Sequence, residues 1–73
     1  MIRIYYIYKV VDLQTLKLES VEIIDQEAEY DGRLLANGYL DKWRAKDYVT
    51  KLLAEDEYYS TFLIQPLLIH ENR

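Results

Sequence analysis

The most constraining feature of this sequence is a predicted strand, residues 61–70, that is apolar on both faces. One face carries Phe62, Ile64 and Leu68. The other face carries Leu63, Leu67 and Ile69. Because successive side chains of a strand point to opposite sides of the sheet, each face of this strand needs a cover of its own. Pro66 removes one backbone donor from the middle of the run, so the strand is predicted to lie at a sheet edge or to carry a bulge.

A second strand pattern opens the chain at residues 2–11, where every even-numbered residue is apolar and the odd-numbered ones are mixed. We therefore assign the even positions to the core face and the odd positions to a half-polar face. After the polar turn at residues 12–15, an apolar alternation resumes over residues 16–23 and changes phase at Glu19 and Ser20, which predicts a β-bulge there. The two segments predict an antiparallel hairpin.

An amphipathic helix is predicted between these strands, because its apolar residues recur at i, i+3, i+4, i+7 and i+8. They are Ala45, Tyr48, Val49, Leu52 and Leu53. Asp41 is the expected N-cap, and the helix is expected to end near Leu53 or Ala54. Residues 1–73 then form a single α+β domain: a three-stranded antiparallel β-β-α-β sheet of strand order 2-1-3, with one helix packed on one face.

Residues 25–40 contain two turn dipeptides, Asp31-Gly32 and Asn37-Gly38, around a short apolar run. Either a small hairpin or one capped helical turn fits this pattern.

Composition narrows the classes of partner. A chain of 73 residues without cysteine has neither disulfides nor thiolate zinc sites, so packing or oligomerisation must stabilise its thin core. The net charge is −4 and the basic residues are scattered, which argues against nucleic acid. The apolar N-terminal run is too short for a membrane span or an export signal, and it carries Arg3 and Lys9. We expect a cytoplasmic protein without a cofactor.

Catalytic chemistry has few candidate residues. There is one histidine, His70, close to the C-terminus, where we expect an ordinary solvated side chain, and there are only two serines. The acidic alternation around Glu27, Glu29 and Asp31 fits the start of a calcium loop, but the position for the bidentate glutamate falls on Gly38. The sequence predicts neither an enzyme nor a metal site.

An acidic run follows the predicted helix and precedes two tyrosines. It comprises Glu55, Asp56, Glu57, Tyr58 and Tyr59. Three carboxylates at a helix C-terminus oppose the helix dipole, so one interpretation is a solvated turn beyond the helix end. The other is an acidic rim with two aromatic anchors, suited to a partner with a basic surface.

The sheet face turned away from the helix supplies the main functional hypothesis. The residues assigned to it are Tyr5, Ile7, Val11, Leu63, Leu67 and Ile69. Soluble monomers seldom expose such a patch, which predicts a non-enzymatic interaction module that self-associates, or binds another protein, through this face or through the edge strand. Residues 25–40 could instead fold back over it, using Leu34, Leu35, Tyr39 and Leu40.

A tyrosine-lined recess for a small ligand or peptide is the alternative function. Its expected lining is Tyr30, Tyr39, Trp43, Tyr58 and Tyr59.

Overall fold

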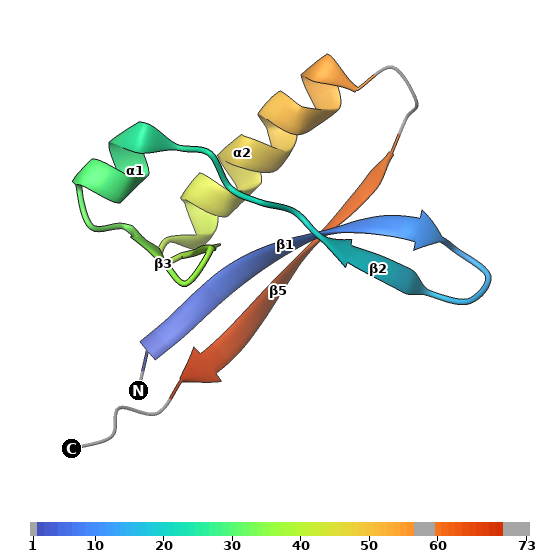
Figure 1. Ribbon diagram of the computed structural model, residues 1–73, viewed down its shortest axis with the longest axis horizontal. Coiled ribbons are helices and arrows are strands. Elements are labelled where there is room, and N and C mark those ends of the chain that lie inside the picture. Colours follow the sequence, from blue (N-terminus) through green and yellow to red (C-terminus); the bar gives the residue numbers. More distant parts are fainter. Residues whose placement is uncertain (1, 57–59, 70–73) are drawn as a thin grey trace.

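The computed structural model describes residues 2–56 and 60–69, which form five strands and two helices (Figure 1). In chain order they are β1 (Ile2–Asp12), β2 (Lys17–Ser20), α1 (Gln26–Tyr30), β3 (Leu34–Leu35), β4 (Gly38–Tyr39), α2 (Lys42–Glu55) and β5 (Thr61–Ile69). The α+β prediction is confirmed. The sheet is wholly antiparallel, but it has five strands rather than three, because residues 34–39 add a small hairpin.

β1 is the centre of the sheet. One of its edges pairs with β5 over nine residues, from Ile2 opposite Ile69 to Val10 opposite Thr61. Its other edge pairs with β2 near the C-terminal end of β1, and with β4 at Tyr5 opposite Tyr39. The predicted neighbours of the first strand are therefore correct. Among the described residues β5 pairs with β1 alone, so Pro66 lies in an edge strand, as its missing N–H requires.

The β1–β2 hairpin contains the irregularity that the sequence predicted, but in the other strand. The register shifts in β1 between Val10 and Asp12, and the expected bulge at Glu19 and Ser20 is wrong. Those two residues pair regularly with Lys9 and Tyr8. β2 ends at Ser20. The apolar alternation changes phase there because the chain leaves the strand.

Both alternatives for residues 25–40 occur, one after the other. Asp25 caps α1 by accepting a hydrogen bond from the Ala28 N–H at 3.1 Å. The β3–β4 hairpin then turns through Ala36 and Asn37, which both have positive φ, as a two-residue turn of this kind requires. Asn37 also accepts from the Ile23 N–H at 2.9 Å and donates to the Val21 carbonyl at 3.2 Å, so it ties the hairpin to the incoming chain.

α2 begins after Asp41, as predicted, but the Asp41 side chain makes no capping hydrogen bond. It accepts instead from the Arg33 guanidinium, through Nε at 2.7 Å and through Nη2. This bidentate pair joins the start of α2 to the segment before β3. The helix ends at Glu55, one or two residues later than predicted.

The core lies between α2 and one face of the sheet. Its buried residues are Ile7, Ile23, Ala28, Tyr39 and Ala45. Partly buried side chains of both long strands pack against it, among them Tyr5, Phe62 and Ile64. The face of β1 that packs on the helix is therefore the odd-numbered one, and the assignment of its even positions to this core is wrong.

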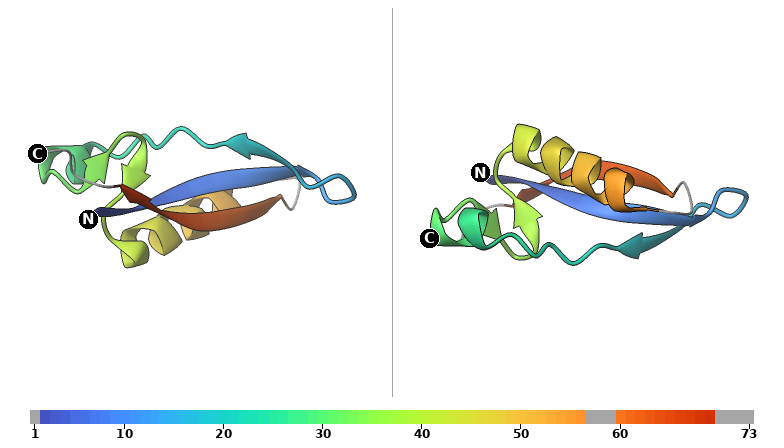
Figure 2. Two further views of the ribbon diagram at one scale, coloured as in Figure 1. Left: turned by 90° about the horizontal axis from the view of Figure 1, so that it is seen from below. Right: turned by 90° about the horizontal axis from the view of Figure 1, so that it is seen from above.

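Figure 2 shows the two faces of the sheet in turn: α2 lies in front of the strands when seen from above and behind them when seen from below. The molecule is elongated, with extents of 42 × 28 × 16 Å and a radius of gyration of 13.0 Å, against about 11 Å for a compact domain of this length. Its accessible surface is 5875 Å², roughly a fifth above the ~4800 Å² typical of a monomer of 8.8 kDa. The fold leaves apolar area uncovered.

Candidate functional site

The uncovered sheet face is built from the even-numbered residues of β1 and the odd-numbered residues of β5. The β1–β5 register places them in five rows across the two strands: Ile2 with Ile69, Ile4 with Leu67, Tyr6 with Gln65, Tyr8 with Leu63, and Val10 with Thr61. We call these ten residues the open face. Leu18 of β2 extends it beside Val10, and Gly38 of β4 lies next to the side chains of Ile4 and Tyr6.

The open face is apolar, and its solvent-exposed residues lie on β5, whereas Ile4 of β1 is fully buried and the other β1 residues are half-buried. Leu63 and Leu67 are 43% and 53% exposed, and the neighbouring Leu18 is 38% exposed. Among its ten residues only Gln65, Thr61 and the two tyrosines carry polar atoms, and none carries a charge. Arg3 and Lys9 belong to the odd-numbered, helix-facing positions of β1. Figure 2, in the view from below, shows that neither helix lies over β1 and β5 on this side.

The six residues predicted to form one surface do not share a face. Leu63, Leu67 and Ile69 are on the open face, but Ile7 is 1% exposed in the core and Tyr5 packs against that core. Val11, which lies at the register shift, is 49% exposed. The grouping fails because every pair between β1 and β5 joins an even-numbered residue to an odd-numbered one. The sequence pattern showed the strands but not this register.

Of the four residues in segment 25–40 that were expected to cover the open face, Tyr39 and Leu34 lie on the other side of the sheet. Tyr39 is fully buried on the helix side, and Leu34 packs against the same core. Because β4 pairs with the edge of β1, the hairpin widens the sheet, and Gly38 lies against the buried Ile4 side chain. Leu35 remains 45% exposed.

The acidic run lies partly outside the described residues, which include neither Glu57 nor Tyr58 and Tyr59. Glu55 is the last residue of α2 and is exposed. Asp56 follows it, donates its N–H to the Leu53 carbonyl, and accepts the Ser60 N–H through its side chain at 2.5 Å. One carboxylate of the run therefore fixes the local backbone. His70 also lies outside the described residues.

The described aromatic residues expected to line a recess do not converge. Tyr39 is buried, whereas Tyr30 is 90% and Trp43 is 63% exposed. Tyr58 and Tyr59 belong to the part that is not described. Trp43 lines a polar pocket to which neither Tyr30 nor Tyr39 contributes.

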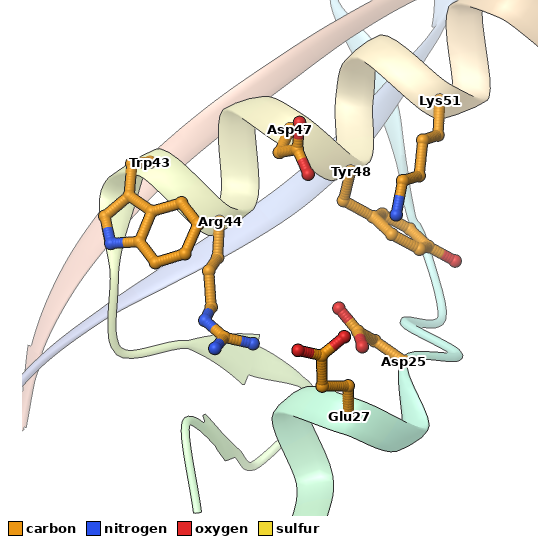
Figure 3. A pocket seen from close by; sticks show the side chains of 7 residues that line it. All are labelled: Asp25, Glu27, Trp43, Arg44, Asp47, Tyr48 and Lys51. Carbon is orange, nitrogen blue, oxygen red and sulfur yellow. The ribbon is translucent and has the colours of Figure 1, made fainter. Parts of the chain in front are cut away.

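This pocket, of about 160 Å³, lies between the start of α1 and one side of α2 (Figure 3). Its lining comprises Asp25, Glu27, Trp43, Arg44, Asp47, Tyr48 and Lys51. In Figure 3 the carboxylates of Asp25 and Glu27 point toward the guanidinium of Arg44. Arg44 stacks 5.0 Å from the Trp43 ring centroid and lies 3.5 Å from an Asp31 carboxylate oxygen. Arg44 thus joins this side of α2 to the C-terminal end of α1 through Asp31.

Asp25 links the pocket wall to the core. Besides capping α1, it accepts a 2.5 Å hydrogen bond from the Tyr39 hydroxyl. This bond, followed by that from the Ala28 N–H, holds the pKa of the Asp25 carboxyl below its ordinary value. Burial, followed by the bond to Asp25, raises the pKa of Tyr39. Tyr39 therefore remains a neutral donor, and the sole polar atom of this buried side chain is satisfied.

The pKa of the Asp41 carboxyl is also lowered, but by a different partner. Its hydrogen bonds from Arg33 hold its pKa below the ordinary value. Arg44 Nε lies 3.8 Å from Asp41 Oδ2, too far for a hydrogen bond, and this buried atom has no hydrogen-bond partner among the described residues. The sequence did not reveal that Asp25 binds Tyr39 or that Asp41 binds Arg33. Its only signal was that both aspartates stand at positions suited to a helix N-cap.

Acid is expected to destabilise the fold through these two carboxyl groups. Their folded pKa values lie below the ordinary 3.8, so the unfolded chain binds their protons first. The stability that they contribute is present above that value and is lost as the pH falls through the folded pKa values. Urea midpoints measured from neutral pH down to about 3 should fall below about pH 4, and the fall should be shallower in Asp25→Asn/Asp41→Asn. An equally steep fall in this variant would contradict the assignment.

Other site classes find no support in the described parts of the chain. Residues 2–56 and 60–69 contain no group of three or more side chains able to hold a metal ion. Over the same residues, neither helix has the length and apolar content needed to cross a membrane. Comparisons with protein-family models, curated proteins and solved structures gave no match.

Proposed function

We propose that this protein is a non-enzymatic interaction module that forms a homodimer through the open face of its sheet. The observation that supports this most is the exposure of Leu18, Leu63 and Leu67 on one continuous surface without a charged residue. Contiguous apolar area of this kind marks interaction surfaces in soluble proteins. A second sheet packed on the face would cover Leu63 and Leu67, the exposed leucines on that side of β5.

The absence of charged side chains on the open face allows a second copy to bind there. The chain carries a net charge of −4, so two copies repel each other over most of their surface. The open face has no charged side chain, and two copies can therefore meet there without opposing like charges. A surface that matches itself is what a two-fold symmetric dimer uses.

The size and shape of the molecule support the same conclusion. A standard interface buries about 800 Å² on each partner. The accessible surface exceeds that of a typical monomer of this mass by a comparable area. Dimerisation through the open face would bring the exposed area of each chain close to that of a compact domain.

Association through the face is favoured over association through the β5 edge. The outer edge of β5 is unpaired among the described residues, but Pro66 interrupts it near its middle. A proline has no N–H to donate, so a second strand added there would lose a ladder hydrogen bond. The chain has no cysteine, so the proposed dimer contains no disulfide. Such a dimer can form in the reducing environment of the cytoplasm.

Leu67→Lys is expected to dissociate this dimer while the chain stays folded. The substitution places an ammonium in an apolar interface, and we expect the dissociation constant to rise at least ~10-fold. Leu67 is 53% exposed within one chain, so the core beneath α2 is not disturbed. Sedimentation equilibrium gives the mass, and circular dichroism reports the fold.

The matched control is Leu13→Lys. Leu13 is 70% exposed in the β1–β2 turn, beyond the rows of the open face. It introduces the same charge and should leave association unchanged. If Leu67→Lys is folded and as associated as Leu13→Lys, the open face is not the interface.

A further inference from the structure

The turn between β3 and β4 contains the dipeptide Asn37-Gly38, and we infer that Asn37 is a site of spontaneous, irreversible deamidation that the folded hairpin holds unreactive. The reaction joins the backbone nitrogen of Gly38 to Cγ of Asn37. Glycine favours this ring closure because it has no β-carbon to obstruct the approach and leaves the backbone free to rotate. The reaction takes place within one chain and is independent of the proposed dimer.

The chemistry consumes only water, and asparagine is among the thermolabile residues. The Gly38 amide nitrogen loses its proton to solvent base and bonds to Asn37 Cγ, while the Cγ–Nδ2 bond breaks and Nδ2 leaves as ammonia. Water then opens the resulting cyclic imide at either of its carbonyls. One opening gives aspartate, and the other gives isoaspartate, in which the chain continues through Cγ. The net change is the replacement of an amide NH2 by OH, without any electron transfer.

The folded chain holds both reacting groups. The Asn37 side chain accepts from the Ile23 N–H at 2.9 Å and donates to the Val21 carbonyl at 3.2 Å. Its rotation toward the Gly38 nitrogen would break both hydrogen bonds. Gly38 itself is buried in β4 and pairs with Leu35 across the turn. Because Asn37 is exposed, these bonds and not its own burial protect it, and the reaction requires the hairpin to separate from residues 21–23.

Deamidation would prevent the hairpin from docking again. An aspartate has no side-chain N–H for the Val21 carbonyl and turns a carboxylate oxygen toward it instead. An isoaspartate adds a methylene to the backbone of a two-residue turn, and this shifts Gly38 in the space beside Ile4, where even a β-carbon would clash. The docked turn also holds Ile23, which belongs to the core. Each modified chain therefore loses stability that refolding does not restore.

Deamidation rates in the folded chain and in a free peptide test the protection. Trypsin cuts after Arg33 and Lys42, and the released peptide, residues 34–42, has Asn37 as its only side-chain amide. The natural chain is incubated at mildly basic pH beside the synthetic peptide 34–42, digested at intervals, and analysed by liquid chromatography and mass spectrometry. We expect Asn37 to react at least ~10-fold more slowly in the folded chain, because only the opened fraction reacts. In concentrated urea the two rates should coincide.

Two controls isolate the ring-closure mechanism. The peptide 34–42 with Gly38→Ala should react more slowly, because a β-carbon obstructs the closure. In the unfolded chain Asn72, the other asparagine, precedes arginine and should react more slowly than Asn37. Opening of the imide yields two products of equal mass that separate on the column, whereas direct hydrolysis of the amide would yield aspartate alone.

The variant Asn37→Asp tests the structural consequence. It should raise the ratio of unfolded to folded chain at least ~10-fold, measured by urea denaturation, because the Val21 carbonyl exchanges a donor for a repelling oxygen. The matched control is Gln14→Glu, which introduces the same charge at an exposed residue of the β1–β2 turn and should leave the ratio unchanged.

Three results would overturn the assignment. Equal rates for Asn37 in the folded chain and in the free peptide would show that the hairpin gives no protection. If the peptide and the unfolded chain yielded no isoaspartate, the dipeptide would not be a deamidation site. An Asn37→Asp variant as stable as Gln14→Glu would contradict the loss of docking.

Discussion

Ile7→Ala should lower the free energy of unfolding by about 2–5 kcal/mol, the usual cost of such a deletion in a packed core. Ile7 is 1% exposed and contacts the cluster that joins the sheet to both helices. A domain of 73 residues is stabilised by roughly 4–11 kcal/mol in total, so this one deletion removes a large share. Urea denaturation at one fixed protein concentration measures the loss.

The control is the same substitution at Ile24. That side chain is 75% exposed, and Ile24→Ala should change the free energy of unfolding by less than ~0.5 kcal/mol. If Ile7→Ala cost no more than Ile24→Ala, the odd-numbered positions of β1 could not be the core face.

Gly38→Ala should cost about 3 kcal/mol, at the upper end for overpacking. A β-carbon at this position would lie 2.2 Å from Cγ2 of Ile4, and 3.2 Å from both the Tyr5 carbonyl oxygen and the Tyr6 ring. Ile4 is fully buried and has no room to move. The β4 strand would have to separate from β1, at the one residue pair that joins them.

Gly32→Ala separates this steric effect from backbone strain. Gly32 has a φ of 69°, and a β-carbon added there would meet no atom within 4 Å, so its substitution costs only the ~1–2 kcal/mol of a left-handed residue.

The second check is Gly38→Ala combined with Ile4→Ala, which removes the clashing carbon. The double variant should lose less stability than the two single losses added together. Strict additivity would show that Ile4 is not the obstacle.

Periodicity predicted the strands and the main helix because they bury long apolar stripes. It could not predict which face of β1 packs on α2, because both faces carry enough apolar residues to form a core. The choice depends on the register between β1 and β5. That register pairs Tyr6 with Gln65 and Ile7 with Ile64. A shift by one residue would exchange the faces, and nothing local in the two strands specifies it.

The short elements were missed for another reason. Asn37 binds the chain at Ile23, and Asp25 binds Tyr39, both over a separation of fourteen residues. The turn dipeptides indicated where the chain reverses, but these tertiary hydrogen bonds decide that a helical turn and a hairpin both form. An exposed apolar sheet face was expected, but on the odd-numbered side of β1; of its six predicted members only Leu63, Leu67 and Ile69 belong to the open face.

Sedimentation equilibrium of the natural chain tests the proposed dimer most directly. Over micromolar concentrations the proposal predicts a mass that rises toward twice the 8.8 kDa of one chain, with the folded circular dichroism signal unchanged. A constant mass of 8.8 kDa up to about 1 mM, with the chain folded throughout, would contradict it.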